Sequence, residues 1–461
     1  MKTALAGLSA VFLFEMLDTS ILTVALPTIG RDLHASTLAL QWVTGAYGVV
    51  FGCLMLAFGA VADRFGRRRV MLTGLVLLGA SSLATAFVTT AGQLIAVRVL
   101  TGVAAAMTTP GSMALAYRLY DDEQRRVRAI NLISTVGLIG LAVGPTIGGF
   151  VLAVAPWQVL LLVNVPIAAL AYLGIRTGIA PDDPADLHRD PINVPGALLG
   201  TATIALALIA PTLFVDEGVT SWIPWTAVAG AVLAGVLFTR RPLVDLELLT
   251  RPLVASGLAY KAAAGLAVAG LGYLVTLQLQ LDWGWSPAMA SLGMLPQVAV
   301  LVAGSAFVGP FVRRAGLNRA ARLSAVAVVL GLGVYGVFGR LGYLWVAIAL
   351  ALVAAGLRVI GVVAGVSVLQ GLPENRTTIG AALTDTVTEV SSAIGVAVSG
   401  TILATLFTGP VAGLPWSARQ TTEFHHTLTT AGLSLTFIAA CLVAFSRTIP
   451  ALTRRPQKAA R

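Results

Sequence analysis

A few charged side chains lie inside long apolar runs of this 461-residue sequence. The acidic ones are Glu15, Asp18, Asp385 and Glu389, and the basic ones are Arg98, Lys261 and Arg358. Such a residue inside a membrane-spanning helix costs at least about 2.5–3.5 kcal/mol, so it is functional by default. A medium of low dielectric favours the neutral form of a carboxyl. A buried carboxyl can therefore take up a proton and release it when a substrate binds, which is the minimal chemistry of proton-coupled exchange.

The acidic residues come in two pairs. Asp385 and Glu389 are four residues apart, so both side chains lie on one face of a helix. Glu15 precedes Asp18 by about one turn and lies on a similar face. We expect Asp18, Asp385 and Glu389 to take part in proton coupling or substrate binding. Glu15 either joins that site or reaches a water-filled vestibule, and a structural ion pair is the alternative for the others.

The basic residues have different expected roles. Arg98 is a candidate partner for one of the carboxylates. Lys261 is about nine residues from the end of its span, or roughly 13 Å at the helical rise, so its ammonium group can reach the membrane surface. Arg358 lies deeper in its span, and it is a candidate partner for Asp385 or Glu389.

The composition indicates which elements hold these charges. Hydrophobic residues make up 57% of the chain and charged residues 11%, against about 45–50% and about 25% in soluble domains. A soluble enzyme is excluded, because so few charges cannot form a water-facing surface, and disorder is excluded too. Because a spanning helix takes about 20 residues, we predict an all-α integral membrane protein. Its fourteen expected spans lie near residues 5–29, 38–62, 70–90, 93–117, 129–153, 157–178, 195–214, 222–239, 253–281, 288–311, 321–338, 343–370, 380–408 and 428–448.

The loops between these spans differ in charge. The chain has 30 Lys and Arg residues against 20 Asp and Glu residues, so its net charge is +10, and most of the basic residues fall in alternate loops and in the terminal segments. The other loops hold only Arg31, Arg340 and Arg419. Positively charged loops stay in the cytoplasm, so we expect both termini there and no nucleic-acid partner. Glu15 and Asp18 interrupt the first apolar run, which is therefore expected to remain as an uncleaved span.

No set of residues indicates a metal or a nucleotide. Cys53 and Cys441 lie in apolar runs and are expected to be buried thiols rather than disulfide or metal ligands. His425 and His426 lie in the longest non-cytoplasmic loop, near residues 408–427. They could bind a metal or sense pH, although a solvated loop is favoured. The sequence has no G-x-x-x-x-G-K-[ST] loop, so an ATP-driven pump is excluded.

Two stretches of the chain repeat at an offset of 250 residues. Gly59 and Gly66 in the first stretch match Gly309 and Gly316 in the second, and several basic positions coincide. Repeated halves around a site at the membrane midplane are a transporter architecture. We predict an N-terminal six-span bundle, a two-helix insertion and a C-terminal six-span bundle with its tail, at residues 1–190, 191–245 and 246–461.

The first stretch resembles the loop 2–3 signature of the major facilitator superfamily, G-x-x-x-D-R-x-G-R-R. The matching residues are Gly59, Asp63, Arg64, Gly66 and Arg67, followed by Arg68. The glycines permit a tight turn, and the basic residues hold that turn at the membrane surface. The resemblance implies a conformational gate in which the Asp63 loop latches one state.

The fifth predicted span carries a second motif of that superfamily. Gly140, Gly144, Pro145, Gly148 and Gly149 resemble the antiporter motif of its exporters, G-x-x-x-G-P-x-x-G-G. Small residues at this spacing let helices approach closely, and Pro145 breaks one helical hydrogen bond. The resemblance implies that this span forms part of the hinge.

Further stretches resemble the fourteen-span drug:proton antiporters of the superfamily. Leu17–Pro27 is similar to their first-span signature, and Arg98 with Gly102 is similar to their R-x-x-x-G pattern in span 4. Asp385 and Glu389 match acidic positions in span 13 of quaternary-ammonium and lipophilic-cation exporters. The resemblance implies two six-helix bundles plus two inserted helices. It also implies that spans 1 and 13 line a central cavity and that Arg98 organises the proton site.

The implied activity is the export of amphipathic, cationic drugs or antibiotics in exchange for protons, and not an enzymatic reaction. The expected partners are a small amphipathic substrate, protons and the cell-membrane bilayer, with no cofactor besides the proton-motive force and with a monomeric protein. The sequence departs from the pattern of the cation exporters of this branch at two positions. They do not typically have an arginine at the position of Arg358, and some have an acidic residue where this chain has Leu301. Both differences widen the expected substrate class. The alternatives are a dedicated exporter of one zwitterionic or weakly acidic compound, a nutrient:proton symporter, and a receptor or scaffold without transport.

Overall fold

The computed structural model describes residues 2–119, 123–182, 194–218, 220–240, 249–372, 377–408 and 416–448. The regular elements within these ranges are all helical. In chain order they are α1 (Lys2–Asp32), α2 (Thr37–Phe65), α3 (Arg67–Ala84), η1 (Thr85–Phe87), α4 (Ala91–Arg118), α5 (Glu123–Val154), α6 (Gln158–Leu162), α7 (Asn164–Gly178), α8 (Val194–Asp216), α9 (Trp222–Arg240), α11 (Pro252–Leu277), η3 (Gln278–Asp282), α12 (Pro287–Gly293), α13 (Leu295–Ala303), α14 (Ser305–Ala315), α15 (Leu317–Phe338), η4 (Gly339–Leu341), α16 (Tyr343–Gly371), α17 (Thr377–Leu406) and α18 (Ala418–Thr448).

The helices coincide with the fourteen predicted spans. Within the described ranges, 11 helices are long and apolar enough to cross a membrane, and up to 13 are if each of two bent pairs counts as one span. The remaining predicted span corresponds to α8, whose apolar part, Pro195–Ala210, is shorter than the others. The prediction of an all-α membrane fold is confirmed, and the count of fourteen is consistent with it.

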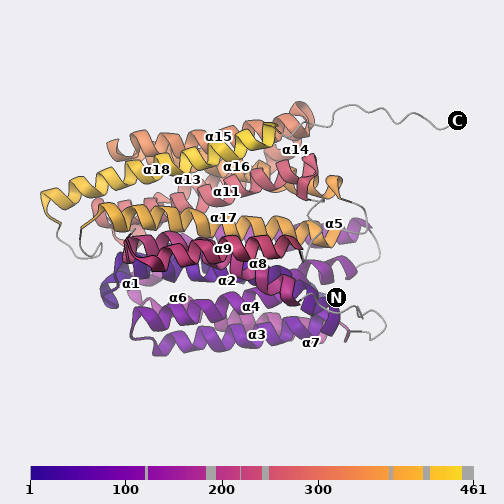
Figure 1. The fold of residues 1–461 in the computed structure, drawn as a ribbon. Helices are drawn as coiled ribbons and strands as arrows, with labels where there is room; N and C mark the ends of the chain where they lie inside the picture. The colour runs from indigo at the N-terminus through magenta and orange to yellow at the C-terminus, as the bar shows by residue number, and fades with distance from the viewer. Residues whose placement is uncertain are drawn as a thin grey trace.

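The helices form two groups that lie side by side (Figure 1). In the first group α1 packs on α5 and α7, and α4 packs on α2 and α3; in the second group α11 packs on α16, α17 and α18, and α15 packs on α16 and α18. The groups meet where α2 contacts α17 and where α5 contacts α12 and α13. Helices α8 and α9 pair with each other, and α8 lies across the seam on α2 and α17. Thr201 of α8 donates a hydrogen bond to the Cys53 carbonyl oxygen at 3.0 Å.

Two glycines support the repeat that the sequence predicts. Gly66 separates α2 from α3 with a φ of 103°, and Gly316 separates α14 from α15 with a φ of 76°. A residue with a side chain rarely adopts a positive φ, so glycine is required at both turns. The same turn therefore recurs at the predicted offset, in each half of the molecule.

Two predicted spans are bent where proline removes a helical hydrogen bond. The fifth span bends by 43° between Thr135–Leu141 and Val143–Val154. Pro145 has no N–H to bond the Leu141 carbonyl, so the helix is weakest at this point. The tenth span bends by 67° between Leu295–Ala303 and Phe307–Ala315, near Gly304 and before Pro310.

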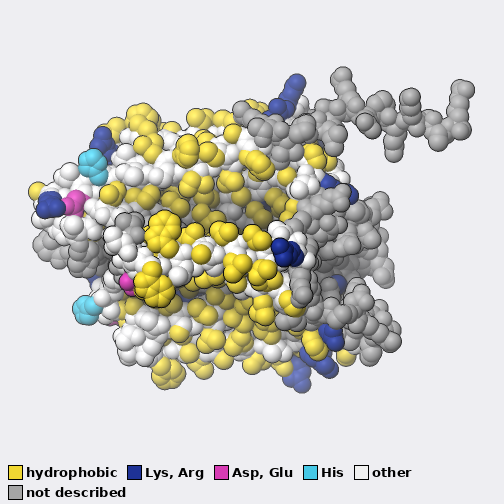
Figure 2. Space-filling view, viewed as in Figure 1, with side chains coloured by type: hydrophobic (Ala, Val, Ile, Leu, Met, Phe, Trp, Pro, Cys, Tyr) yellow, Lys and Arg dark blue, Asp and Glu magenta, His cyan; other side chains and the backbone are white. Residues whose placement is uncertain are grey.

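Apolar side chains cover the side of the bundle between its two ends (Figure 2). Phe307, Leu170 and Phe437 are 70%, 65% and 71% exposed. A continuous apolar surface of this kind is unstable in water and suits the hydrocarbon core of a bilayer. We call the end at which α1 begins the near end and the opposite end the far end; α18 ends at the near end (Figure 1). Most Lys and Arg side chains visible in Figure 2 lie toward the near end.

Candidate functional site

Asp18 of α1 forms a closed, buried ion pair. Arg98 Nη1 of α4 lies 2.6 Å from Asp18 Oδ2, and both side chains are almost fully buried. Asn164 of α7 donates a hydrogen bond from Nδ2 to Asp18 Oδ1 at 2.7 Å. Both carboxylate oxygens thus have a strong donor, as a buried charge requires. The structure thereby brings three helices of the first half together at one carboxylate.

Tyr47 of α2 lies beside this ion pair and near the other embedded acids. The Arg98 guanidinium stacks over the Tyr47 ring at 4.8 Å from the ring centroid, within the range of a cation–π interaction. The Tyr47 hydroxyl is buried and has no hydrogen-bond partner among the described residues. It interacts electrostatically with Glu15 and Glu389 as well as with Asp18 and Arg98. Tyr47 therefore connects the two sets of charges.

Glu15 is bonded within the first half and lies near acidic residues of the second half. Its Oε2 accepts a hydrogen bond from Thr109 Oγ1 of α4 at 3.0 Å, and the side chain is buried. The negative charges of Glu389 and Asp385, both on α17, repel that of Glu15. A Cβ atom on Gly48 of α2 would lie 3.8 Å from Glu389 Oε2, so this carboxylate points toward the first half. Carboxyls from both halves thus share one site.

Lys261 of α11 belongs to the same site. Helices α11 and α17 run parallel and touch where Gly265 meets the Thr388 carbonyl, and Ser392 donates a hydrogen bond to the Gly265 carbonyl at 3.3 Å. Lys261 is one turn before Gly265 and Asp385 is about one turn before Thr388, so the two charges lie at one level. Lys261 attracts both Asp385 and Glu389. Its ammonium group therefore acts on the charge cluster, whereas the sequence alone leaves a position at the membrane surface open.

Arg358 of α16 lies in a different place. It lines a groove of about 320 Å³ together with Gly304 and Phe307, at the bend of the tenth span. The other lining residues come from α13, α14, α15 and α16 and are largely apolar. The electrostatic neighbour of Asp385 and Glu389 is Lys261 rather than Arg358.

The loop between α2 and α3 is fixed by a residue from elsewhere in the chain. The Asp182 carboxylate, beyond α7, accepts hydrogen bonds from the backbone N–H groups of Arg68 and Arg69, each at 3.1 Å. These are two of the first N–H groups of α3, so Asp182 caps that helix. A Cβ atom on Gly66 would overlap the same carboxylate. Glycine is thus required here both for its φ and for the space it leaves.

The other predicted gate residues surround this turn. Arg64 lies 5.9 Å from the centroid of the Phe65 ring, and Arg67 begins α3. Gly59 of α2 faces Pro110 of α4. The Asp63 side chain lies outside the described part of the structure. Its predicted role as a latch therefore stays a prediction.

The glycines of the fifth span face two different partners. Cβ atoms on Gly140, Gly144 and Gly148 would collide with Leu13, Ser20 and Ile21 of α1, respectively. Ser20 also donates a hydrogen bond to the Gly140 carbonyl at 3.3 Å. A Cβ atom on Gly149 would instead collide with Pro287 and Ser291 of α12, in the second half. The motif thus packs α5 on α1 inside one half and on α12 across the seam.

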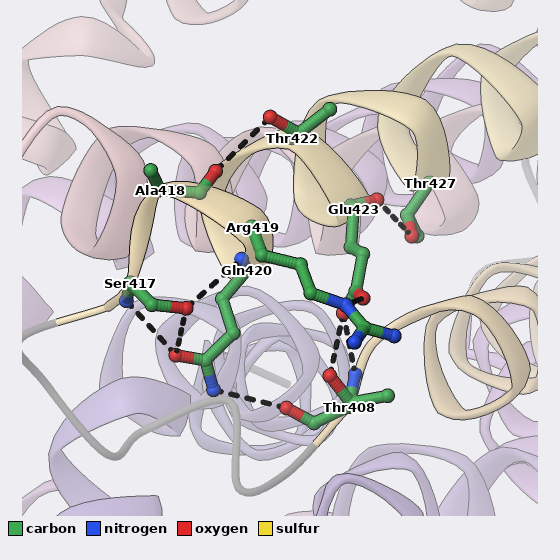
Figure 3. Close-up of polar contacts among 8 residues, drawn as sticks. All are labelled: Thr408, Ser417, Ala418, Arg419, Gln420, Thr422, Glu423 and Thr427. Atoms are coloured by element: carbon green, nitrogen blue, oxygen red, sulfur yellow. Dashed lines mark hydrogen bonds and ion pairs between the residues drawn. The ribbon is translucent and has the colours of Figure 1, made fainter.

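A polar cluster lies at the far end, where α17 ends and α18 begins (Figure 3). Glu423 accepts hydrogen bonds from Thr408 N and Oγ1 at 3.1 and 2.6 Å and from Arg419 Nε at 2.7 Å. His425 Nε2 lies 3.0 Å from Asp282 Oδ1, at the end of η3. The described residues contain no group of three His, Cys, Asp or Glu side chains placed as metal ligands. The predicted solvated loop is therefore in part a packed helix, since His425 pairs with a residue remote in sequence.

The two cysteines differ from each other. Cys53 is buried, as expected, whereas Cys441 is exposed on α18. The expectation of a buried thiol is wrong for Cys441. It lies on the outside of the bundle, where an apolar side chain can face lipid.

Sequence reasoning missed the neutral partners of the charged residues. Asn164, Thr109 and Tyr47 are uncharged, and their types give no sign of which carboxylate they approach. The only signal was the position of Asn164, an amide inside an apolar run. Asp182 gave none, because it lies in a loop far along the chain from α3.

The fold and its buried charges are those of a membrane transporter. The sequence profile of the Major Facilitator Superfamily matches residues 8–396, which include every embedded charge named above. The chain belongs to this superfamily, whose members are multi-pass membrane transporters and not enzymes. The fold is similar to nucleoside transporter NupG, with a TM-score of 0.64, 14% identity and coverage of 97% of this chain and 100% of that one. It is also similar to a peptide transporter POT, with a TM-score of 0.69, 15% identity and coverage of 97% and 94%.

Several relatives have names that refer to resistance or efflux. The chain is 34% identical to methyl viologen resistance protein SmvA of Salmonella typhimurium over 306 residues, which cover 65% of this chain and 61% of SmvA. It is 28% identical to multidrug efflux pump LfrA of Mycolicibacterium smegmatis over 424 residues, covering 88% and 81%. It is 30% identical to the methylenomycin A resistance protein of Bacillus subtilis over 410 residues, covering 85% of each chain.

Proposed function

We propose that this protein is a secondary active exporter that exchanges amphipathic, cationic compounds for protons by alternating access. The observation that carries this proposal is the cluster of carboxyls contributed by both halves, with Glu15 on α1 and Asp385 and Glu389 on α17. A cation bound between the halves would meet carboxylates from each, and it would displace the protons they hold. The names of SmvA and LfrA support export of a cation or of several drugs.

Alternating access requires the halves to separate at one end and close at the other. At the far end, Gln280 Nε2 of η3 donates a hydrogen bond to the Val24 carbonyl of α1 at 2.8 Å. In addition, Gly149 packs on α12, and Gly400 of α17 packs on Gln41 of α2. These contacts support a form that is closed at the far end. With both termini in the cytoplasm, that form would expose the carboxyl cluster to the cytoplasm.

The Asp18–Arg98 pair has a separate part in this proposal. It joins α1 to α4, and Asn164 adds α7, so the first half would move as a rigid body. The Tyr47 ring, against Arg98 and beside Glu389, would transmit a change in the charge of the cluster to this pair. Proton-motive force alone would drive the cycle, with no cofactor and with a monomeric protein.

The test uses purified protein in weakly buffered proteoliposomes with a pH dye. Adding tetraphenylphosphonium should release protons, and Glu389→Gln should reduce that release at least tenfold. Glu217→Gln, which removes an exposed acid after α8, is the matched control and should behave as the unmodified protein does. Absence of proton release with any cation would overturn the proposal.

A zwitterionic or weakly acidic substrate is the second candidate. It is favoured by Arg358, whose guanidinium lines an apolar groove at the bend of the tenth span. Proton release with a zwitterionic antibiotic, but not with tetraphenylphosphonium, would support this candidate. Loss of that release in Arg358→Gln would assign the groove to the substrate.

A further inference from the structure

We propose that two added positive charges neutralise the cluster of Glu15, Asp385, Glu389 and Lys261, and that Lys261 sets this number. A doubly charged cation would then be exchanged for two protons, and a singly charged cation for one. The inference rests on the proposed function, because it specifies the charge of the substrate and the number of protons at the same site.

The number follows from the charges that act on one another. Glu389 Oε2 lies 3.8 Å from where a Cβ atom on Gly48 of α2 would be, and Lys261 lies level with Asp385 where α11 packs on α17. The charges of Glu389 and Asp385 repel that of Glu15, and Lys261 attracts the two acids of α17. With all groups ionised, three carboxylates face one ammonium group, so two negative charges remain without compensation. Asp18 contributes nothing to this sum, because Arg98 neutralises it at 2.6 Å.

Among the residues that the structure describes, no other titratable group acts on these three carboxyls so as to change the sum. Tyr47, on α2, feels Glu15, Glu389, Asp18 and Arg98, but a phenol is neutral at physiological pH. Thr109, on α4, only donates a hydrogen bond to Glu15. The charges counted thus come from α1, α11 and α17, whereas α2 and α4 supply the neutral side chains Tyr47 and Thr109.

Two uncompensated charges inside a low-dielectric region are strongly unfavourable. The cluster without substrate would therefore hold two protons, and its third carboxylate would pair with Lys261. A cation with two charges would release both protons and leave the cluster neutral. A cation with one charge would release only one proton, because releasing both would leave a net negative charge.

Lys261 has a direct effect on this number. If the charge of Lys261 is removed, three negative charges of the ionised cluster remain without compensation instead of two. If one carboxyl is replaced by an amide and Lys261 is kept, one negative charge remains without compensation. If both changes are made together, as in Asp385→Asn with Lys261→Met, the number returns to two although neither native side chain is present.

The experiment measures the protons released per cation bound. Isothermal titration of the purified full-length protein, in buffers of different ionisation enthalpy, gives this number directly. The probes are methyl viologen, which carries two positive charges, and tetraphenylphosphonium, which carries one. The unmodified protein should release two protons with the first and one with the second, and the control variant Glu217→Gln should give the same numbers.

The variants then separate charge from structure. Asp385→Asn should bind methyl viologen at least tenfold more weakly while still releasing one proton with tetraphenylphosphonium. The double variant should recover methyl viologen binding and the release of two protons. Glu15→Gln, alone and with Lys261→Met, repeats the test in case Asp385→Asn does not fold, and the thermal unfolding of each variant is the check.

The outcomes distinguish the inference from the proposed function. If neither cation releases protons from the unmodified protein, the proposed function itself fails. If both cations release the same number, or if folded double variants of both carboxyls fail to recover methyl viologen binding, the two-charge inference is wrong and proton exchange stands.

Discussion

The ion pair between Asp18 and Arg98 is the most enclosed of the embedded charges. Both side chains are almost fully buried, and Asn164 donates a hydrogen bond to the Asp18 carboxylate. The sequence predicts that both charged side chains lie inside membrane-spanning helices, because each interrupts an apolar run. It could not predict that they pair with each other, since 80 residues separate them and the partner depends on how α1 packs on α4.

Removing one member of this pair should destabilise the protein. Asp18→Asn leaves the Arg98 guanidinium buried without a counter-charge, which costs about 3–5 kcal/mol in the free energy of unfolding. Asp18→Asn together with Arg98→Met removes both charges and should recover most of that loss. Denaturant unfolding in detergent measures both variants, and a double variant no more stable than Asp18→Asn alone would contradict the pairing. We expect coupled transport to be lost in both, although the double variant folds.

Lys261 illustrates a second limit of prediction at this scale. Lys261 is close enough to the end of its span for the ammonium group to reach the membrane surface. The parallel register of α11 on α17, fixed where Gly265 meets Thr388, places it beside Asp385 instead. Such a register depends on small residues in both helices, and a single sequence gives no means of aligning them.

At the scale of elements, α5 combines a bend with two packing faces. The sequence predicts the bend from Pro145 and the close packing from the glycines, and the structure has both. The separate direction of Gly149 could not be predicted, because it depends on where α12 of the other half lies. Likewise, the sequence predicts the turn at Gly66 but not the cap from Asp182.

Pro145→Ala should reduce exchange more than substrate binding. The substitution restores the N–H that can bond the Leu141 carbonyl and so straightens the helix at its 43° bend. We expect turnover in proteoliposomes to fall at least tenfold while the Kd for tetraphenylphosphonium changes less than threefold. Equal losses in turnover and in binding would contradict a role for the bend in the conformational change.

Asp182→Ala should destabilise the start of α3. It removes the acceptor for the Arg68 and Arg69 N–H groups, and loss of a helix cap costs typically about 1 kcal/mol. Hydrogen exchange at these two amides should become faster, whereas exchange in the middle of α3 should not change. Asp182→Asn keeps an acceptor and serves as the control, with an intermediate effect. Unchanged exchange at the two amides would contradict the cap.

At the scale of the whole molecule, the contacts between the halves should decide which end is open. A side chain at Gly149 would overlap Pro287 and Ser291 of α12. Gly149→Val should therefore keep the halves apart at the far end. Spin labels on Val154→Cys and Leu292→Cys, with Cys53 and Cys441 replaced by Ser, should report a longer distance in this variant. A distance that matches the unmodified protein would mean that the contact does not control closure.

Much of the overall architecture could be predicted from the sequence. Apolar runs predict the helices, and the repeat around Gly66 and Gly316 predicts that the chain has two halves. The relation of the halves to each other could not be predicted, because it depends on contacts such as α2 with α17 that join residues far apart in sequence. The site lies where the two halves meet, so the set of residues that form it could be identified only from the structure.

The exchange of a cation for protons at this junction is tested most directly by an imposed proton gradient. Proteoliposomes with an acidic lumen, and with the membrane potential held at zero by valinomycin and equal potassium, are diluted into radiolabelled tetraphenylphosphonium. We predict accumulation above equilibrium only when the lumen is acidic, and none for Glu389→Gln. Accumulation driven instead by an alkaline lumen, as in a symporter, or accumulation that ignores the gradient, would contradict proton-coupled export.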